Sequence, residues 1–119
     1  MPEAMELDGL DEQATVWLAQ VGGQVVGTAR ARRVDGFAKA ERVAVESAFR
    51  RSGVGQALMG AVEAWAREEG LQGVVLHAQE SALSFYRSIG YELTGEAFDE
   101  AGIPHRPMKK APPGRGPAP

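Results

Sequence analysis

The first half of the chain alternates between small or apolar residues and polar ones, as strands do. Residues 15–19 and 24–32 flank the pair Gly22-Gly23, which predicts a hairpin. Asp35-Gly36 supplies a second turn into the segment 38–45. The three segments together predict an antiparallel meander.

A helical period replaces this alternation after Gly53. Apolar residues recur at the spacing i, i+3, i+4, i+7, i+8 and i+11, which places them on one face of a helix. The members of this stripe are Val54, Ala57, Leu58, Ala61, Val62 and Trp65. Gln56, Glu63 and Arg67 fall on other faces, and Gly70 is expected to end the helix as its C′ residue.

A second strand and a second helix follow. Residues 73–78 form a short apolar run typical of a buried strand. Ser81 can cap a shorter helix that Gly90 ends. The apolar stripe of this helix consists of Ala82, Phe85, Tyr86 and Ile89. A strand, a helix and a strand in this order predict that segments 38–45 and 73–78 pair in parallel.

The two ends of the chain differ from this central region. Residues 1–13 are polar and acidic without a sustained period, and we interpret them as a loose arm. After Gly90, residues 91–94 alternate as a strand, a loop runs through Asp99, and residues 104–109 return as an edge strand that tolerates proline. Residues 111–119 are mostly proline, glycine and alanine and predict a disordered tail. One domain, residues 14–110, lies between them.

Composition limits the class of protein. With 119 residues, 44% of them hydrophobic, the chain can bury one core and no second one. No window offers the roughly 18 consecutive apolar residues that a membrane span requires, and the acidic N-terminus does not resemble a signal peptide. These features predict a cytoplasmic protein with no membrane partner.

Charge and residue types exclude further chemistry. A net charge of -3 argues against nucleic acid as a partner, because phosphate-dominated binding needs a basic surface. The chain has no cysteine, which excludes disulfides, thiolate metal sites and a cysteine nucleophile, and two histidines are too few for a metal site. We therefore expect no metal and no covalent intermediate on a cysteine.

The segment 50–55, with the sequence RRSGVG, is the strongest candidate for binding chemistry. It lies between an apolar strand and the start of the long helix, where exposed N–H groups and the helix dipole favour an anion such as pyrophosphate. A dinucleotide fingerprint would need glycine at Leu58, and no Gly-Lys-Ser/Thr sequence occurs in the chain. The alternative is a tight turn with two solvated arginines.

Two motifs carry a resemblance to a known family. The pattern Arg/Gln-x-x-Gly-x-Gly/Ala at residues 50–55 resembles the acyl-coenzyme A signature of the GNAT superfamily of N-acetyltransferases. Residues 82–91, ALSFYRSIGY, resemble its second signature, A-x-x-F-Y-x-x-x-G-F/Y, and residues 100–109 are similar to the closing hairpin of one bacterial branch. The resemblance implies an α/β fold, a mixed antiparallel and parallel twisted sheet with flanking helices, and acetyl-CoA as co-substrate.

The resemblance also implies a binding mode for acetyl-CoA. The pantetheine arm would insert between two splayed strands, residues 42–45 and 74–78, and pair with the backbone at Val43 and Val45. The pyrophosphate would accept N–H bonds from the loop, and Arg87 is a weaker candidate for the adenosine 3′-phosphate. The residues of the implied phosphate loop are Arg50, Arg51, Ser52, Gly53, Val54, Gly55 and Gln56.

The implied reaction is direct transfer of an acetyl group to a primary amine in a ternary complex. Tyr86 resembles the family's usual acid, since a phenol with a pKa near ~10 can protonate a leaving thiolate; the alternative is an aromatic residue packed under the sheet. The base stays open between Glu41, acting through water, His77, His105 and an external base. The acceptor, a small molecule or a protein amine, is not specified.

One departure from the family pattern concerns the front of the chain. GNAT domains usually begin with a strand and two helices, whereas about fourteen residues precede the first hairpin here. This predicts a homodimer in which a partner closes the acceptor side, with Trp17 exposed and an open sheet edge available for docking. The alternatives are a non-catalytic acyl-CoA-binding or regulatory module, and a structural dimerisation domain without a ligand.

Overall fold

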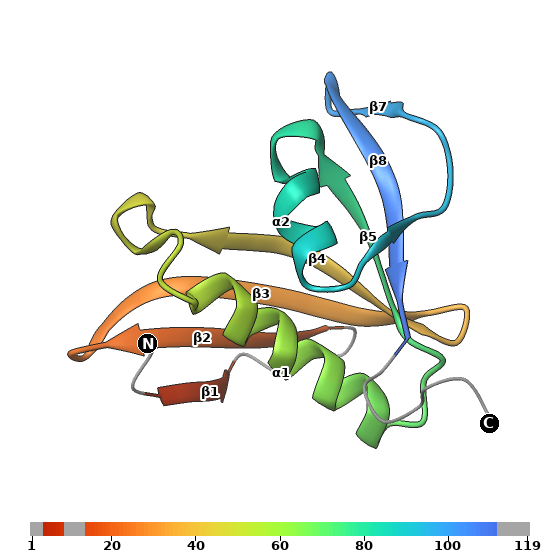
Figure 1. The fold of residues 1–119 in the computed structure, drawn as a ribbon. Coiled ribbons are helices and arrows are strands. Elements are labelled where there is room, and N and C mark those ends of the chain that lie inside the picture. Colours follow the sequence, from red (N-terminus) through yellow and green to blue (C-terminus); the bar gives the residue numbers. More distant parts are fainter. Residues whose placement is uncertain (1–3, 9–13, 112–119) are drawn as a thin grey trace.

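The computed structural model describes residues 4–8 and 14–111. Within them eight strands form one sheet in the order β1-β2-β3-β4-β5-β8-β6, and β7 pairs with β8 (Figure 1). The strands are β1 (Ala4–Asp8), β2 (Thr15–Val21), β3 (Gln24–Val34), β4 (Phe37–Val45), β5 (Val74–Gln79), β6 (Glu92–Leu93), β7 (Phe98–Glu100) and β8 (Ile103–Lys110). The helices are α1 (Val54–Glu68) and α2 (Leu83–Ser88), with 3-10 turns at Ser47–Phe49 and Glu80–Ala82. The expected α/β fold with a mixed sheet is confirmed.

Strands β2 to β4 form the predicted antiparallel meander. Val21 pairs with Gln24 and Val34 with Phe37, so each turn contains two residues. All four turn residues have positive φ, as type I′ turns require. Alanines fill the buried positions on one face of these strands, which lets a helix pack close to the backbone. They are Ala19, Ala29, Ala31, Ala38 and Ala40.

The structure corrects three expectations in this half of the sheet and beyond it. Residues 4–8, part of the segment interpreted as a loose arm, pair antiparallel with β2 from Ala4↔Gln20 to Asp8↔Val16; such edge pairing depends on backbone groups and leaves little periodicity in five residues. Trp17 was expected to be exposed, but only 6% of it is, because its ring packs edge-on against Trp65 at 5.7 Å. The loop through Asp99 contains β7.

Helix α1 follows β4 and covers the buried face of the meander. Gly53, with φ of 93°, is its N-cap, and Gly70 ends it as predicted. The N–H groups of Gly70 and Leu71 donate to the carbonyls of Arg67 and Ala66, the pattern of a Schellman motif. A side chain at Gly27 on β3 would meet the Val54 side chain at 2.9 Å and the Ala44 carbonyl at 3.2 Å, so this glycine permits the close approach of α1.

Glu63 lies off the apolar stripe of α1, yet it is only 5% exposed. The Tyr91 hydroxyl donates to its Oε2 at 2.9 Å, and Lys110 Nζ donates to its Oε1 at 3.2 Å. Lys110 Nζ also donates to the Ile89 carbonyl at 2.6 Å. A charge and two hydrogen bonds therefore satisfy the buried carboxylate, which the helical period alone does not reveal.

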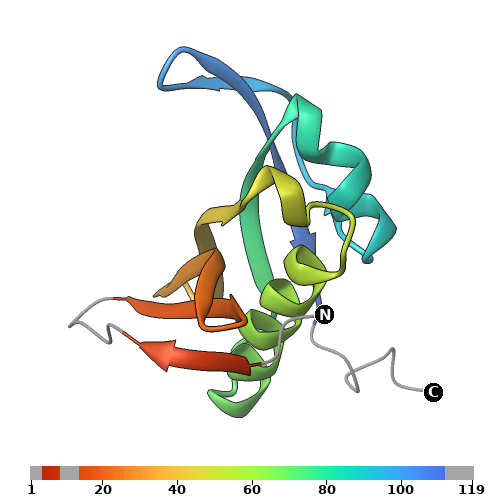
Figure 2. The same ribbon diagram turned by 90° about the vertical axis from the view of Figure 1, so that its left-hand side faces the viewer.

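Strands β4 and β5 form a fork. They pair in parallel through three residue pairs only, from Ala38↔Val74 to Ala40↔Leu76, and then diverge (Figure 2). On its other side β4 has one residue more than β3 between the pairs Thr28↔Ala44 and Arg30↔Glu41. Arg42 lies in this bulge with φ of 53°. Because a bulge bends its strand and increases the twist, it turns the end of β4 away from β5.

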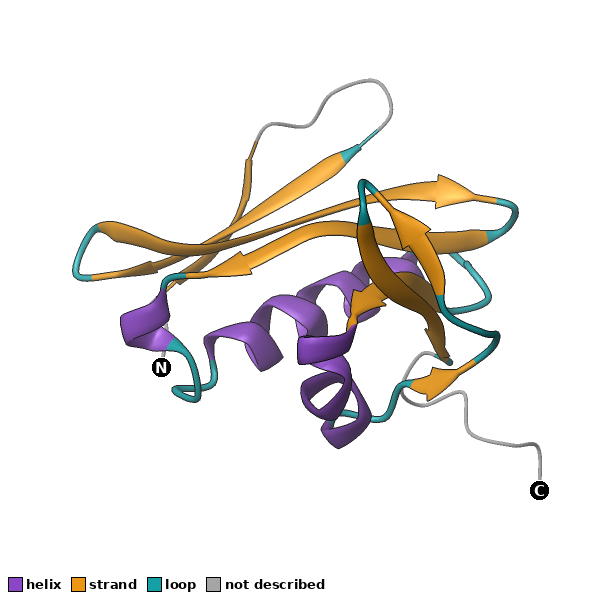
Figure 3. Cartoon of the chain, turned by 90° about the horizontal axis from the view of Figure 1, so that it is seen from above, coloured by secondary structure: helices purple, strands orange, loops and turns teal. Residues whose placement is uncertain are grey.

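Helix α2 and the remaining strands complete the second half. Ala82 is the N-cap of α2, without a side-chain hydrogen bond. The expected cap by Ser81 is wrong, because Ser81 lies within the 3-10 turn that leads into the helix. Helices α1 and α2 lie on the same side of the long strands (Figure 3). Neither described helix combines the length and apolar character needed to cross a membrane. The predicted tail at 112–119 lies outside the described residues.

Candidate functional site

A cleft of about 1030 Å³ opens where β4 and β5 separate. The half of β4 beyond the fork lines one side, and the ends of β5, β7 and α2 line the other. The loop before α1 reaches the cleft through Arg50, Arg51 and Gly53, and the first turn of α1 through Gly55 and Gln56. The fork therefore joins the candidate phosphate loop to the second half of the sheet.

Backbone geometry exposes amide groups at the loop. Arg51 and Gly53 both have positive φ, 66° and 93°, so the chain turns sharply into the helix. The first helical hydrogen bond runs from Ala57 N–H to the Gly53 carbonyl at 3.0 Å. The N–H groups of residues 53–56 thus have no partner within the helix, and neither a side-chain cap nor an acidic residue occupies its first turn. This is the arrangement of an anion site.

The side chains around the loop agree with an anionic ligand. Arg42, Arg50 and Arg51 all line the cleft, and the Arg50 guanidinium donates to the Val45 carbonyl at 3.3 Å. Ser52 donates its hydroxyl to the Phe49 carbonyl and so stabilises the turn itself. A side chain at Gly55 would meet the Phe85 ring at 3.1 Å, so glycine keeps the gap between α1 and α2 open.

Tyr86 on α2 lines the cleft from the helix side of the sheet. It is 8% exposed, and its ring lies edge-on against Phe85 at 5.0 Å and Tyr91 at 5.6 Å. Burial raises the pKa of Tyr86 to about 12, since desolvation disfavours the phenolate. Tyr86 therefore holds its proton across the physiological pH range and can act as a proton donor.

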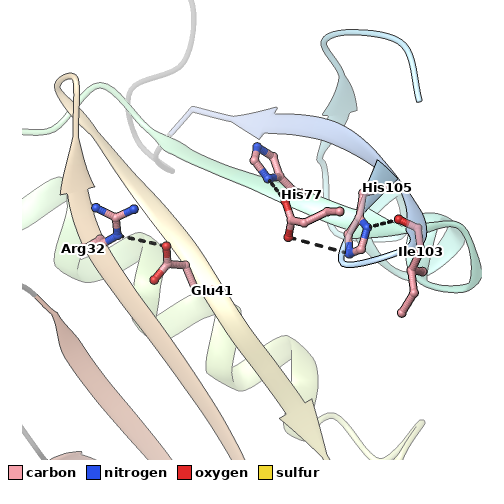
Figure 4. Close-up of polar contacts among 6 residues, drawn as sticks. Arg32, Glu41, His77, Ile103 and His105 are labelled. Carbon is pink, nitrogen blue, oxygen red and sulfur yellow. Dashed lines mark hydrogen bonds and ion pairs between the residues drawn. The ribbon is translucent and has the colours of Figure 1, made fainter. Parts of the chain in front are cut away.

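Glu41 on β4 also lines the cleft, but its carboxylate is already engaged (Figure 4). Arg32 Nε donates to Glu41 Oε2 at 3.0 Å, and Arg30 Nε lies 3.9 Å from Oε1. Both arginines come from β3, so Glu41 is held against the meander. The hydrogen bond from Arg32 occupies one of the two carboxylate oxygens of Glu41.

His77, Glu100 and His105 form a polar cluster on the other arm of the fork (Figure 4). His77 Nδ1 donates to Glu100 Oε1 at 2.8 Å, and His105 Nε2 lies 4.0 Å from Glu100 Oε2. The hydrogen bond from His77 holds the pKa of Glu100 below its usual range. The Phe98 ring lies edge-on to His77 at 4.9 Å and stacks with His105 at 6.3 Å.

Comparison with known proteins decides the family. Residues 1–112 match the profile described as the acetyltransferase (GNAT) domain. The chain belongs to the GNAT acetyltransferase family. Two Bacillus subtilis proteins are similar to it: the uncharacterised protein YyaT, 39% identical over 105 residues that cover 88% of this chain and 71% of YyaT, and the uncharacterised N-acetyltransferase YjcF, 38% identical over 111 residues that cover 92% and 79%.

Solved GNAT structures share the fold. A candidate streptothricin acetyltransferase from Bacillus anthracis, solved in complex with acetyl coenzyme A, superimposes with a TM-score of 0.76 at 20% identity, over 85% of this chain and 64% of that one. At that identity the likeness shows the fold alone. Membership of the family confirms the enzyme class expected from the two motifs, an acyl-CoA-dependent N-acetyltransferase.

The GNAT cleft brings together most residues expected at the site. They are Glu41, Val43, Val45, Arg50, Arg51, Gly53, Gly55, Gln56, His77, Tyr86 and His105. Ser52, Val54 and Arg87 are not among the residues that line it. The Val54 side chain is fully buried in the core, and Arg87 is exposed on α2. Which of these residues contact acetyl-CoA stays a prediction.

Some cleft residues of this GNAT domain were not expected. Glu100 lines the cleft and lies near both histidines, and Phe98, which is not among the lining residues, packs against their rings. The sequence signal for both is weak because β7 has three residues. Lys39 lines the cleft near the fork, in phase with Glu41 on β4. That phase was visible in the alternation of β4. Within residues 4–8 and 14–111, no group of three or more His, Asp or Glu residues is arranged to hold a metal ion.

Proposed function

We propose that this protein transfers the acetyl group of acetyl-CoA to a primary amine, directly and within a ternary complex. The observation that carries the proposal is the fork between β4 and β5, which links uncapped helix amides at one arm to titratable side chains at the other. A thioester lying in the fork would have a proton donor beside it and an approach for an amine.

The coenzyme would lie along the free side of β4. Parallel pairing with β5 ends at Ala40, so Val43 and Val45 line the cleft without β5 as a backbone partner, and Arg50 would have to release the Val45 carbonyl for the coenzyme to use it. The two amides of a pantetheine arm can pair with such a strand edge. The pyrophosphate would then meet the N–H groups of Gly53, Gly55 and Gln56. Arg87 is a proposed contact for a 3′-phosphate outside the cleft.

Tyr86 would supply the proton that the leaving thiolate needs. Its pKa of about 12 keeps the phenol protonated. Its side chain lines the cleft between the two arms. The proton passes from the Tyr86 hydroxyl to the coenzyme sulfur as the C–S bond breaks. Glu41 stays a candidate base that would act through water.

Assembly and location are further proposals. A cytoplasmic location agrees with the absence of cysteine and with the acidic charge of the chain. A homodimer could form along the outer edge at β1, since an edge strand can pair with another chain. Trp17 no longer supports such a dimer, because it is buried against Trp65. Light scattering at micromolar concentrations measures the oligomeric state.

Incubation of purified protein with acetyl-CoA and a panel of primary amines tests the function. The panel contains polyamines, aminoglycosides, amino acids and a peptide N-terminus. Release of free thiol together with an N-acetylated amine in the mass spectrum is the expected result. Calorimetric binding of acetyl-CoA without thiol release for any amine would instead favour a non-catalytic acyl-CoA-binding module. If the protein does not bind acetyl-CoA, both the acetyltransferase hypothesis and the binding-module hypothesis are excluded.

A further inference from the structure

The two imidazoles of the polar cluster on β5, β7 and β8 have different hydrogen-bond partners. His105 Nδ1 lies 2.8 Å from the Ile103 carbonyl, and a carbonyl oxygen only accepts hydrogen bonds. Neutral His105 therefore carries its proton on Nδ1 and its free lone pair on Nε2. His105 is 7% exposed, and the Phe98 ring stacks on it, so its orientation is fixed and few waters compete for Nε2.

Glu100 lies near the Nε2 lone pair of His105 but makes no hydrogen bond to it. The 4.0 Å between His105 Nε2 and Glu100 Oε2 is too long for a hydrogen bond. An N–H group of a ligand can therefore approach both atoms. Glu100 Oε1 is bound by His77 Nδ1 at 2.8 Å, which keeps the carboxylate in place and turns Oε2 toward His105.

We propose that His105 is the general base that deprotonates the acceptor amine, and that Glu100 binds the same amine as an ammonium ion beforehand. This deepens the proposed acetyl transfer and rests on it. The substrate class follows from the pair of groups: a primary amine that is protonated in solution. A carboxylate attracts the cation, and the imidazole lone pair takes its proton.

Glu41 suits this role less well, because Arg32 and Arg30 already bind it. Its guanidinium partners would also repel an incoming ammonium ion. The side chain of Glu100, by contrast, is 49% exposed, so a solvated cation can reach it from outside the cleft. Other charged and titratable groups line the cleft with His105. They are Lys39, Glu41 and Arg42 on β4, Arg50 and Arg51 before α1, His77 on β5, Tyr86 on α2 and Glu100 on β7. Arg106 is the next residue after His105 on β8.

The step balances as follows in atoms and charge. One proton moves from the ammonium nitrogen to His105 Nε2, and the carboxylate of Glu100 stabilises the imidazolium ion formed. The neutral nitrogen attacks the thioester carbon, a C–N bond forms, and the C–S bond breaks. Tyr86 protonates the departing sulfur and regains a proton, through water, from the acylated nitrogen. Each turnover of an ammonium substrate thus releases one proton from His105 to solvent.

The variant His105→Asn tests the base role sharply. The asparagine amide can keep the donor to the Ile103 carbonyl, whereas the Nε2 lone pair is lost. We expect kcat/KM for the best amine of the panel to fall about 10²- to 10⁴-fold at neutral pH. Wild-type kcat/KM should depend less steeply on pH than that of the variant, which should rise about tenfold per pH unit with the free-amine fraction. Calorimetric affinity for acetyl-CoA should stay unchanged, which also shows that the variant is folded.

Glu100→Gln tests the binding role, with Glu96→Gln as its matched control. Both residues are exposed glutamates before or within β7, but only Glu100 lines the cleft. Glu100→Gln should raise the KM of the amine about tenfold, equivalent to about 1.4 kcal/mol of binding, while Glu96→Gln leaves it unchanged.

The outcomes separate this inference from the proposed function. If the wild-type protein acetylates an amine while His105→Asn keeps its rate and its pH profile, His105 is not the base although the protein is an acetyltransferase. Equal KM values for Glu100→Gln and Glu96→Gln would overturn the ammonium site. A wild-type protein that acetylates no amine overturns the proposed function itself.

Discussion

The two arms of the fork present different kinds of groups to the cleft. After β4, the uncapped start of α1 at Gly53, Gly55 and Gln56 lines the cleft, together with Arg42, Arg50 and Arg51. On the β5 arm His77 holds Glu100 by a hydrogen bond, and the Ile103 carbonyl holds His105. The β4 arm therefore suits acetyl-CoA, which is the same in every acetylation, and the β5 arm suits the amine, which varies between reactions.

Because the arms differ in this way, acetyl-CoA affinity and amine kinetics should each report on one arm. A change on the β4 arm should alter acetyl-CoA affinity and leave the pH profile alone. A change on the β5 arm should alter amine kinetics and leave acetyl-CoA affinity alone. Tyr86, on α2 between the arms, should affect turnover without affecting either binding step.

Tyr86→Phe should give the largest effect. Loss of the proton donor is expected to reduce kcat about 10²- to 10⁴-fold, because a general acid contributes that much to bond cleavage. Acetyl-CoA affinity measured by calorimetry should change less than about twofold, since phenylalanine keeps the ring contacts with Phe85 and Tyr91. A variant with wild-type kcat would remove Tyr86 from the mechanism.

Replacement of both Gly53 and Gly55 by valine should break the β4 arm. Gly53 has φ of 93°, which valine does not adopt without strain, and a side chain at position 55 meets Phe85. Loss of two charge-assisted hydrogen bonds predicts at least about a 100-fold drop in acetyl-CoA affinity by calorimetry.

Gly60→Val in the same helix is the matched control for the glycine pair. A side chain at Gly60 meets nothing within 4 Å, so this variant adds the same bulk to α1 away from the cleft. It should bind acetyl-CoA as tightly as the wild-type protein. Equal loss of affinity in the control and in the double variant would mean that the loop does not bind the coenzyme.

Alkaline pH should separate the buried tyrosine from the exposed arms. The pKa of the Tyr86 phenol is near 10 in the unfolded protein, and burial raises it to about 12 in the folded protein. Above pH 10 the folded state therefore binds more protons than the unfolded state, so its stability falls as pH rises. From pH 9 to pH 12 the wild-type protein should lose about 2–3 kcal/mol that Tyr86→Phe does not lose. Urea unfolding of both proteins at each pH measures this, and parallel curves would contradict it.

Glu41→Gln should have the smallest effect on catalysis. Because its carboxylate is held by Arg32 and Arg30, we expect less than about a tenfold change in kcat/KM and no change in the shape of the pH profile. Steady-state kinetics with the best amine of the panel measure both. A loss as large as that expected for His105→Asn would make Glu41 the base and would break the distinction between the arms.

The fold could be predicted largely from local signals. Two glycine turns, the stripe of α1 and the glycine that ends it specify the meander and the crossover, because each depends on neighbours in sequence. The burial of Trp17, and that of Glu63, does not follow from local pattern because their partners, Trp65, Tyr91 and Lys110, lie 28 or more residues away. Periodicity does not report such distant contacts.

The candidate site divides in the same way. The glycine loop was visible in the sequence, since one short motif contains all its groups. The role of Glu100 was not, because it depends on β7 folding back on β8 so that one carboxylate lies between two histidines from different strands. The bulge at Arg42, which opens the fork, has no local sequence signal either.

Gly27 on β3 affects the proposed coenzyme site indirectly, through the position of α1. Since a methyl group there would collide with Val54, the first residue of α1, and with the Ala44 carbonyl, a substitution at Gly27 would shift the point where the helix starts. The position of the N–H groups that we propose for pyrophosphate binding therefore depends on the absence of a side chain at Gly27. Loss of coenzyme affinity could thus arise in natural variants that leave every contacting residue intact.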